Sequence, residues 1–138
     1  MECKKLNILL IEDDAIEVMK LHRVISSKGL NHSIVEANNG VEALDILQKK
    51  EALPDIILLD LNMPKINGIE FLSILKADEV LKHLPTIVLT TSNNQKDVLE
   101  CYKIGIAGYV IKPLKYEDYV QKIEAVLKYW SMNELIVK

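Results

Sequence analysis

The sequence is poor in cysteine, which limits the kinds of site that it can build. Only Cys3 and Cys101 occur in 138 residues, and their spacing matches neither a disulfide framework nor a metal-ligand motif. Such a low cysteine content is typical of a reducing compartment, so we expect a cytoplasmic protein. In that setting Cys101 is expected to serve as a small hydrophobic side chain.

Positive charge and long apolar runs are also scarce. Lys and Arg number 17 against 20 Asp and Glu, the net charge is −3, and no basic stripe is visible. This argues against a surface that binds nucleic acid through its phosphates. Residues 1–5 are short and charged and lead into a run only as long as a strand, so we expect neither a signal peptide nor a membrane span.

The length and the remaining composition indicate one globular domain. Apolar residues make up 49% of the chain, charged residues make up 27%, and the mean hydropathy is +0.11. A chain of this length holds about one domain with one good core. We expect the domain to occupy residues 1–129, with residues 130–138 as a C-terminal tail and no output domain.

Strand-like and helix-like segments alternate along the chain. The expected strands cover residues 6–11, 33–37, 56–59, 86–91 and 109–111; helices are expected at about 15–28, 41–50, 69–76, 95–104 and 116–129. In the first helix, apolar residues recur with helical spacing at Ile16, Met19, Val24 and Ile25. Alternation of this kind predicts an α/β fold, a doubly wound five-stranded parallel sheet with helices on both faces.

Polar residues stand where four of these strands end. Glu12 and Asp13 follow the first strand, Asp60 the third, Thr90 ends the fourth and Lys112 follows the fifth. The carboxyl ends of parallel strands meet at one edge, where ligands of open α/β sheets bind. Asp60 is therefore the candidate for the reacting residue.

Clustered carboxylates favour a bound cation, because like charges at close range raise one another's pKa. Oxygen ligands with room for water and phosphate oxygens predict Mg²⁺. A carboxylate beside that ion can attack phosphorus and form an aspartyl-phosphate. Lys112, the Thr90 hydroxyl and backbone N–H groups near Asn62 and Thr91 could stabilise the phosphate oxygens.

These motifs resemble the receiver domain of two-component response regulators, the CheY-like family, in its single-domain type. The resemblance covers about residues 6–128 and rests on Glu12-Asp13, on Asp60 with Asn62-Met63-Pro64 and Gly68, on Thr90, and on the run from Gly108 to Pro113, all in the family's order and spacing. It implies the flavodoxin-like sheet order 2-1-3-4-5.

The resemblance also implies roles for these residues. Asp60 would accept a phosphoryl group from a histidine kinase or a phosphotransfer protein, and Mg²⁺ would be held by Asp13, Asp60 and the Asn62 backbone carbonyl, with Glu12 acting through water. Thr90 and Tyr109 would form a switch that alters the surface of helix 95–104, strand 109–111 and helix 116–129, where a downstream protein target binds. The Lys112–Pro113 peptide bond is expected to be cis.

Two other functions are compatible with a strand-end Asp. A Mg²⁺-dependent phosphohydrolase would use Asp60 as its nucleophile, but such enzymes generally need a second acid two residues later, where this chain has Asn62. A scaffold that is never phosphorylated would not need the acid cluster or Lys112. We therefore expect a signalling domain, not an enzyme, beyond transfer to and loss from its own aspartate.

Two positions near Asp60 could change how it reacts. Thr91 is larger than the residue that many family members carry there, and this predicts slower attack by small phosphodonors or a phosphatase. Equal rates in a Thr91→Ala variant would contradict that hypothesis. Asn62 and Ser92 flank the pocket and are expected to tune the lifetime of the phosphoryl group.

The remaining polar and aromatic residues have simpler expected roles. Asp14 is either a third acid of the pocket or the cap of the first helix, and we expect the cap. Packing roles are expected for three aromatic residues and ordinary surface roles for three histidines: Tyr102, Tyr119, Trp130, His22, His32 and His83. The apolar tail residues 135–137 are expected either to dock on the chain's own surface or to pair in a homodimer.

Overall fold

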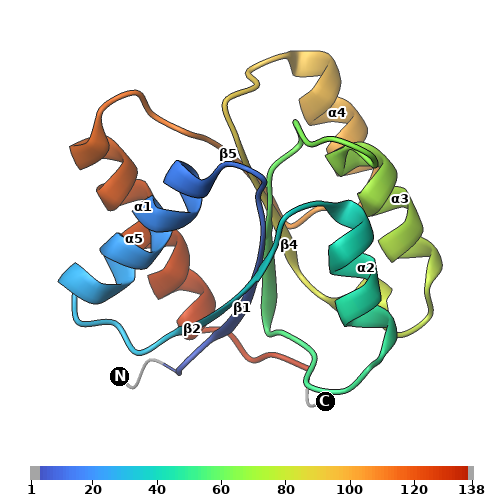
Figure 1. Ribbon diagram of the computed structural model, residues 1–138, viewed down its shortest axis with the longest axis horizontal. Helices are drawn as coiled ribbons and strands as arrows, with labels where there is room; N and C mark the ends of the chain where they lie inside the picture. The colour runs from blue at the N-terminus through green and yellow to red at the C-terminus, as the bar shows by residue number, and fades with distance from the viewer. Residues whose placement is uncertain (1–3, 137–138) are drawn as a thin grey trace.

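The computed structural model describes residues 4–136, which form one parallel sheet flanked by helices (Figure 1). The strands are β1 (Asn7–Ile11), β2 (Ser33–Ala37), β3 (Ile56–Leu59), β4 (Thr86–Thr90) and β5 (Gly108–Ile111). The helices are α1 (Ala15–Ser27), α2 (Gly40–Gln48), α3 (Gly68–Ala77), α4 (Gln95–Ile104) and α5 (Tyr116–Ser131), with a short 3₁₀ turn, η1 (Leu81–His83). The sheet order is β2-β1-β3-β4-β5, so the predicted α/β fold and its order are confirmed.

Alternate residues of each central strand face opposite layers of helices. Leu9 and Ile11 of β1 belong to the core cluster beneath α2, α3 and α4, whereas Ile8 and Leu10 belong to the cluster beneath α1 and α5. Figure 1 shows these two layers on either side of the sheet. The continuous apolar runs of β1, β3 and β4 follow from this arrangement, because both faces of a parallel sheet are buried.

Only some of the apolar residues of α1 pack on the sheet. Ile16 and Met19 are 68% and 69% exposed, while Leu21, Val24 and Ile25 are buried. Residues 21, 24 and 25 follow the i, i+3, i+4 spacing of one helix stripe, and this stripe lies on the sheet. Ile16 and Met19, which also recur with helical spacing, therefore lie outside the stripe that packs on the sheet.

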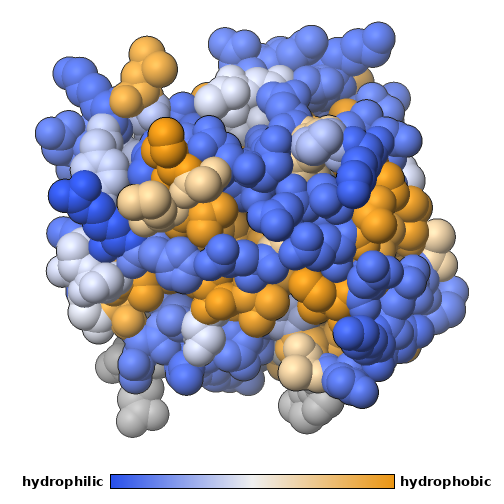
Figure 2. Space-filling view, viewed as in Figure 1, coloured by the Kyte–Doolittle hydropathy of each residue, from blue (hydrophilic) through white to orange (hydrophobic). Residues whose placement is uncertain are grey.

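Apolar side chains are otherwise scattered over the surface. Figure 2 shows apolar residues as separate patches on a mostly hydrophilic face. Tyr102, for which a packing role was expected, is half exposed, whereas Tyr119 is buried and Trp130 packs against the second core cluster. Within residues 4–136, no helix is long and apolar enough to cross a bilayer.

His32 has a structural role that the expected surface role missed. Its Nδ1 accepts a hydrogen bond of 2.9 Å from the Leu6 backbone N–H, next to the start of β1. Burial lowers the pKa of the ring. His22 and His83 are exposed, and His22 lies 2.7 Å from Glu36.

The C-terminal tail begins two residues later than expected, because α5 continues to Ser131. The Ser131 carbonyl accepts a 2.9 Å hydrogen bond from the Lys4 backbone N–H, and Lys4 Nζ lies 3.1 Å from Glu134. Leu135 packs on the second core cluster, while Ile136 is exposed. Leu135 thus docks on the chain's own surface; Val137 lies outside the described residues.

Gly68 allows the loop after β3 to close against the site edge of the sheet. A Cβ built on Gly68 would lie 2.6 Å from Leu61 Cα and 2.9 Å from the Asp60 carbonyl oxygen, and neither backbone atom can move away cheaply. We expect Gly68→Ala to lower the free energy of unfolding by about 1–3 kcal/mol, measured by urea unfolding. Gly108→Ala is the matched control, because its Cβ would meet only Ile87 Cγ2 at 3.8 Å; an equal loss in both variants would contradict this role for Gly68.

Candidate functional site

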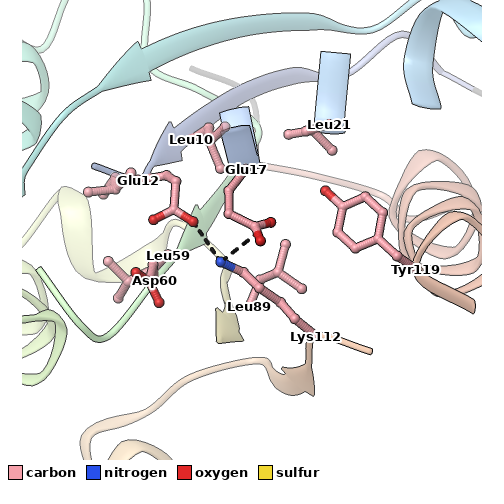
Figure 3. A pocket seen from close by; sticks show the side chains of 10 residues that line it. Leu10, Glu12, Glu17, Leu21, Leu59, Asp60, Leu89, Lys112 and Tyr119 are labelled. Atoms are coloured by element: carbon pink, nitrogen blue, oxygen red, sulfur yellow. Dashed lines mark hydrogen bonds and ion pairs between the residues drawn. The ribbon is translucent and has the colours of Figure 1, made fainter. Parts of the chain in front are cut away.

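Backbone hydrogen bonds continue the sheet one residue past three strands and so place the polar side chains. The Glu12 N–H donates to Ala37 O (3.0 Å), the Asp60 N–H to Ile11 O (3.1 Å) and the Lys112 N–H to Thr90 O (2.8 Å). Glu12, Asp60 and Lys112 are therefore held in strand register although they follow β1, β3 and β5. Their side chains leave the same edge of the sheet and line one pocket (Figure 3).

Three carboxylates come close enough at this edge to share a cation. One oxygen from each of Glu12, Asp13 and Asp60 lies within 4.8 Å of the others. Glu12 and Asp60 are buried, Asp13 is exposed, and Glu12 Oε2 is buried with no hydrogen-bond partner. An oxygen-only donor set with an unpartnered carboxylate oxygen and one open side fits a hard divalent cation such as Mg²⁺.

The Lys112 ammonium group enters the same pocket from the end of β5. Its Nζ lies 2.6 Å from Glu12 Oε1 and 3.8 Å from Glu17 Oε2, and its side chain is only 7% exposed. Leu10, Leu21, Leu59 and Leu89 surround these charges (Figure 3). Apolar side chains around the charges exclude water. The charges therefore interact with one another more strongly than they would at the protein surface.

Burial dominates the protonation of Glu12. Desolvation raises the pKa of Glu12 to about 7; the hydrogen bond and charge of Lys112 oppose this, and the negative charge of Asp60 adds to it. Glu12 is thus an acid whose charge is only partly compensated by the chain's own residues.

Thr90 and Tyr109 do not line the pocket of Asp60 and Lys112, but both form a hydrogen bond with Ser92. Thr90 is fully buried, and its Oγ1 accepts a hydrogen bond of 3.3 Å from the Ser92 N–H. The Tyr109 hydroxyl donates to the Ser92 carbonyl at 2.9 Å, and the Ser92 hydroxyl donates to Asp97 of α4 at 2.8 Å. Burial raises the pKa of Tyr109, so the phenol is neutral at physiological pH. Ser92 therefore links Thr90, Tyr109 and helix α4.

Two predictions concern the loops next to the site, the cap at Asp14 and the cis peptide bond at Lys112–Pro113. The Asp14 side chain accepts a 2.9 Å hydrogen bond from the Ile16 N–H, so its predicted role as the cap of α1 is confirmed. Asn62 and Thr91 are exposed beside the site. The predicted cis bond at Lys112–Pro113 is wrong, because every peptide bond in residues 4–136 is trans, the isomer that X–Pro bonds also prefer.

Glu17 is the pocket residue that sequence reasoning missed. It lies in the first turn of α1, and such an acid is ordinarily explained by the helix dipole alone. The available signal was its spacing, because Glu17 comes four residues after Asp13.

The raised pKa of Glu12 predicts how the metal-free protein responds to pH. A carboxyl with a pKa of 4.5 unfolded and about 7 folded binds its proton more tightly in the folded state, so its contribution to stability is lost as the pH rises from 4.5 to 7. Relative to Glu12→Gln, we expect the wild-type free energy of unfolding to fall by up to about 3 kcal/mol between pH 5 and pH 8, measured by urea unfolding in EDTA. Parallel curves for the two proteins would contradict this assignment.

Comparison with known proteins agrees with this geometry. Residues 8–124 match the family model of the response regulator receiver domain. Response regulator Rcp1 of Synechocystis sp. is 31% identical over 128 residues, covering 89% of this chain and 87% of Rcp1. Chemotaxis protein CheY-3 of Vibrio cholerae is 30% identical over 125 residues, covering 91% of this chain and 94% of CheY-3.

Solved structures give the same result. The phosphorylated cyanobacterial phytochrome response regulator RcpA superposes with a TM-score of 0.89 at 30% identity, covering 96% of this chain and 99% of RcpA. The Mn²⁺-bound form of Rcp1 superposes with a TM-score of 0.88, at the same identity and coverage. With five parallel strands in the order 2-1-3-4-5 and an acidic edge, the chain belongs to the receiver domains of response regulators.

Proposed function

We propose that Asp60 is the phosphoacceptor of this receiver domain and that a histidine kinase or a phosphotransfer protein is the donor. An Asp60 carboxylate oxygen forms a bond to phosphorus while the bond from phosphorus to the donor's imidazole nitrogen breaks, and the imidazole takes up a proton. The convergence of Asp60 with two further acids and a buried lysine at one sheet edge is the observation that supports this function.

Several residues around Asp60 can bind the transferred phosphoryl group or the metal ion beside it. Lys112 is a buried positive charge that can pair with phosphoryl oxygens, and the Thr90 hydroxyl can donate to another. Asp13, Asp60 and the Asn62 backbone carbonyl would hold Mg²⁺, with Glu12 acting through water. When bound, Mg²⁺ supplies positive charge that offsets the clustered carboxylates and the incoming phosphate.

The signal then passes to the surface formed by α4, β5 and α5. If the Thr90 hydroxyl turns to the phosphoryl group, the Ser92 N–H loses its acceptor, and Ser92 also holds Tyr109 and Asp97. Thr90 and Tyr109 therefore form the proposed switch, and a downstream protein target reads the altered face. Homodimerisation is part of this proposal, since Ile136 and Tyr129 remain exposed near the end of α5.

The proposed setting follows from charge and chemistry. A net charge of −3 favours protein partners over nucleic acid, and the cysteine content is typical of the cytoplasm. The domain is proposed to act as a signalling switch, with no reaction other than transfer to and loss from Asp60. A phosphohydrolase is disfavoured, because the position two residues after Asp60 is an exposed amide, Asn62, and not an acid.

Intact-mass spectrometry with acetyl phosphate and Mg²⁺ tests the acceptor directly. We expect a mass gain of one phosphoryl group in the wild type and none in Asp60→Asn, because the amide is a far weaker nucleophile than the carboxylate. Asp45→Asn is the matched control, since Asp45 is an exposed acid of α2 away from the site. Loss of the adduct in Asp45→Asn, or its persistence in Asp60→Asn, would contradict the assignment.

Size-exclusion chromatography of the same samples tests the output. Because homodimerisation is part of the proposal, we expect the phosphorylated wild type to elute earlier than Asp60→Asn. Elution of both at the same volume would contradict that part. Steady release of phosphate by the wild type with no stable adduct would favour the hydrolase, and neither adduct nor release, with a kinase supplied, would favour a scaffold.

A further inference from the structure

Glu17 has a side chain whose position its place in the helix does not explain. It is the third residue after the cap Asp14, where a glutamate ordinarily reaches back to the cap's backbone N–H. Helix α3 has that arrangement, because Glu70 accepts a hydrogen bond from the Asn67 N–H at 3.2 Å. Within α1, the described hydrogen bonds of Glu17 include none to Asp14, and its carboxylate lines the pocket instead.

The Glu17 carboxylate lies between two lysines. Its Oε1 accepts a hydrogen bond from Lys20 Nζ at 3.4 Å, and its Oε2 lies 3.8 Å from Lys112 Nζ. Oε2 is buried and has no hydrogen-bond partner, and Lys112 is the cation that lies near it inside the pocket. Lys20 is itself held 4.4 Å above the ring centroid of Tyr119, which fixes the outer partner.

The Lys112 ammonium group lies near the carboxylates of Glu12 and Glu17, and Asp60 lines the same pocket. Figure 3 shows its nitrogen between Glu12 and Glu17, with dashed lines to both and none to Asp60. Among residues 4–136, no ion pair within 4.0 Å joins Lys112 to Asp60. A phosphoryl group on Asp60 would draw the ammonium towards Asp60, so any attraction from Glu17 opposes that movement. The attraction between Glu17 and Lys112 is strong for charges 3.8 Å apart, because buried charges are poorly screened.

We propose that Glu17 is a positioning residue that holds the Lys112 ammonium away from Asp60 in the resting protein, and that Lys20 sets the strength of this hold by competing for the Glu17 carboxylate. The inference rests on the proposed phosphoacceptor role of Asp60. It assigns to the first turn of α1 a control over how readily the domain enters its phosphorylated state.

Beryllofluoride, a phosphoryl mimic, measures this control in four proteins: the wild type, Glu17→Gln, Lys20→Met and the double variant. We expect Glu17→Gln to bind beryllofluoride about threefold to tenfold more tightly in the presence of Mg²⁺, by ¹⁹F NMR titration. Lys20→Met should bind more weakly than the wild type, because the freed carboxylate turns to Lys112. In the Glu17→Gln background, Lys20→Met should cause no further change. Equal or weaker binding by Glu17→Gln, or additive effects in the double variant, would overturn the inference.

Three controls distinguish the positioning of Lys112 by Glu17 from a general effect of net charge and from metal ligation by Glu17. Glu42→Gln removes the same charge from the same position of α2, outside the pocket, and should leave the affinity unchanged. The effect of Glu17→Gln should persist in 1 M KCl, whereas a general effect of net charge would be screened. A loss of Mg²⁺ affinity above tenfold in Glu17→Gln would make Glu17 a metal ligand and overturn the inference. Failure of the wild type to bind beryllofluoride would instead refute the phosphoacceptor role, and this inference with it.

Discussion

The contact between Lys112 and Glu12 is the interaction on which the site depends. Two oppositely charged side chains lie 2.6 Å apart, and both are almost completely buried. Burying charges is costly unless each is paired, and here, among residues 4–136, Lys112 is the one lysine that lines a pocket with three acids, Glu12, Glu17 and Asp60. Burial raises the pKa of Glu12 to about 7 even though Lys112 opposes the shift, so pairing with Lys112 does not fully offset the cost of burying the Glu12 charge. A site in this condition favours any added positive charge, which is why a divalent cation fits it.

The sheet supplies the rigidity that such a crowded site needs. The parallel register places Glu12, Asp60 and Lys112 one residue past their strands, and the backbone hydrogen bonds at those positions leave little freedom to relax the crowding. The loop from Asp60 to Gly68 closes tightly over the same edge, with the Gly68 N–H donating to Leu61 O at 3.0 Å. Like charges therefore stay close together, and the free energy that this costs can be recovered when a cation or a phosphoryl group changes the charge balance.

Much of this arrangement could be predicted from the sequence, for reasons that are local. Continuous apolar runs ending in polar residues identify β1, β3 and β4, and the ends of parallel strands must share an edge, so Glu12, Asp60 and Lys112 could be brought together from the sequence alone. Asp14 could be identified as a cap because capping involves only its immediate neighbours.

Features that depend on how distant elements pack could not be predicted in the same way. The inward turn of Glu17 depends on Lys112, which follows β5, and the role of His32 depends on the Leu6 N–H. Ile16 and Met19 repeat at helical spacing, but the stripe that packs on the sheet is set by Leu21, Val24 and Ile25. The trans bond at Lys112–Pro113 likewise departs from what the family resemblance implied.

A crystal structure of the beryllofluoride complex with Mg²⁺ would show where the Lys112 ammonium lies once Asp60 carries a phosphoryl mimic, and so whether the charge balance of the pocket controls the site. We expect Lys112 Nζ to lie within hydrogen-bond distance of a fluorine on Asp60 and to have moved further from Glu17 than the 3.8 Å of the resting protein. Lys112 still paired with Glu12 and Glu17, or the mimic attached to another residue, would contradict this control.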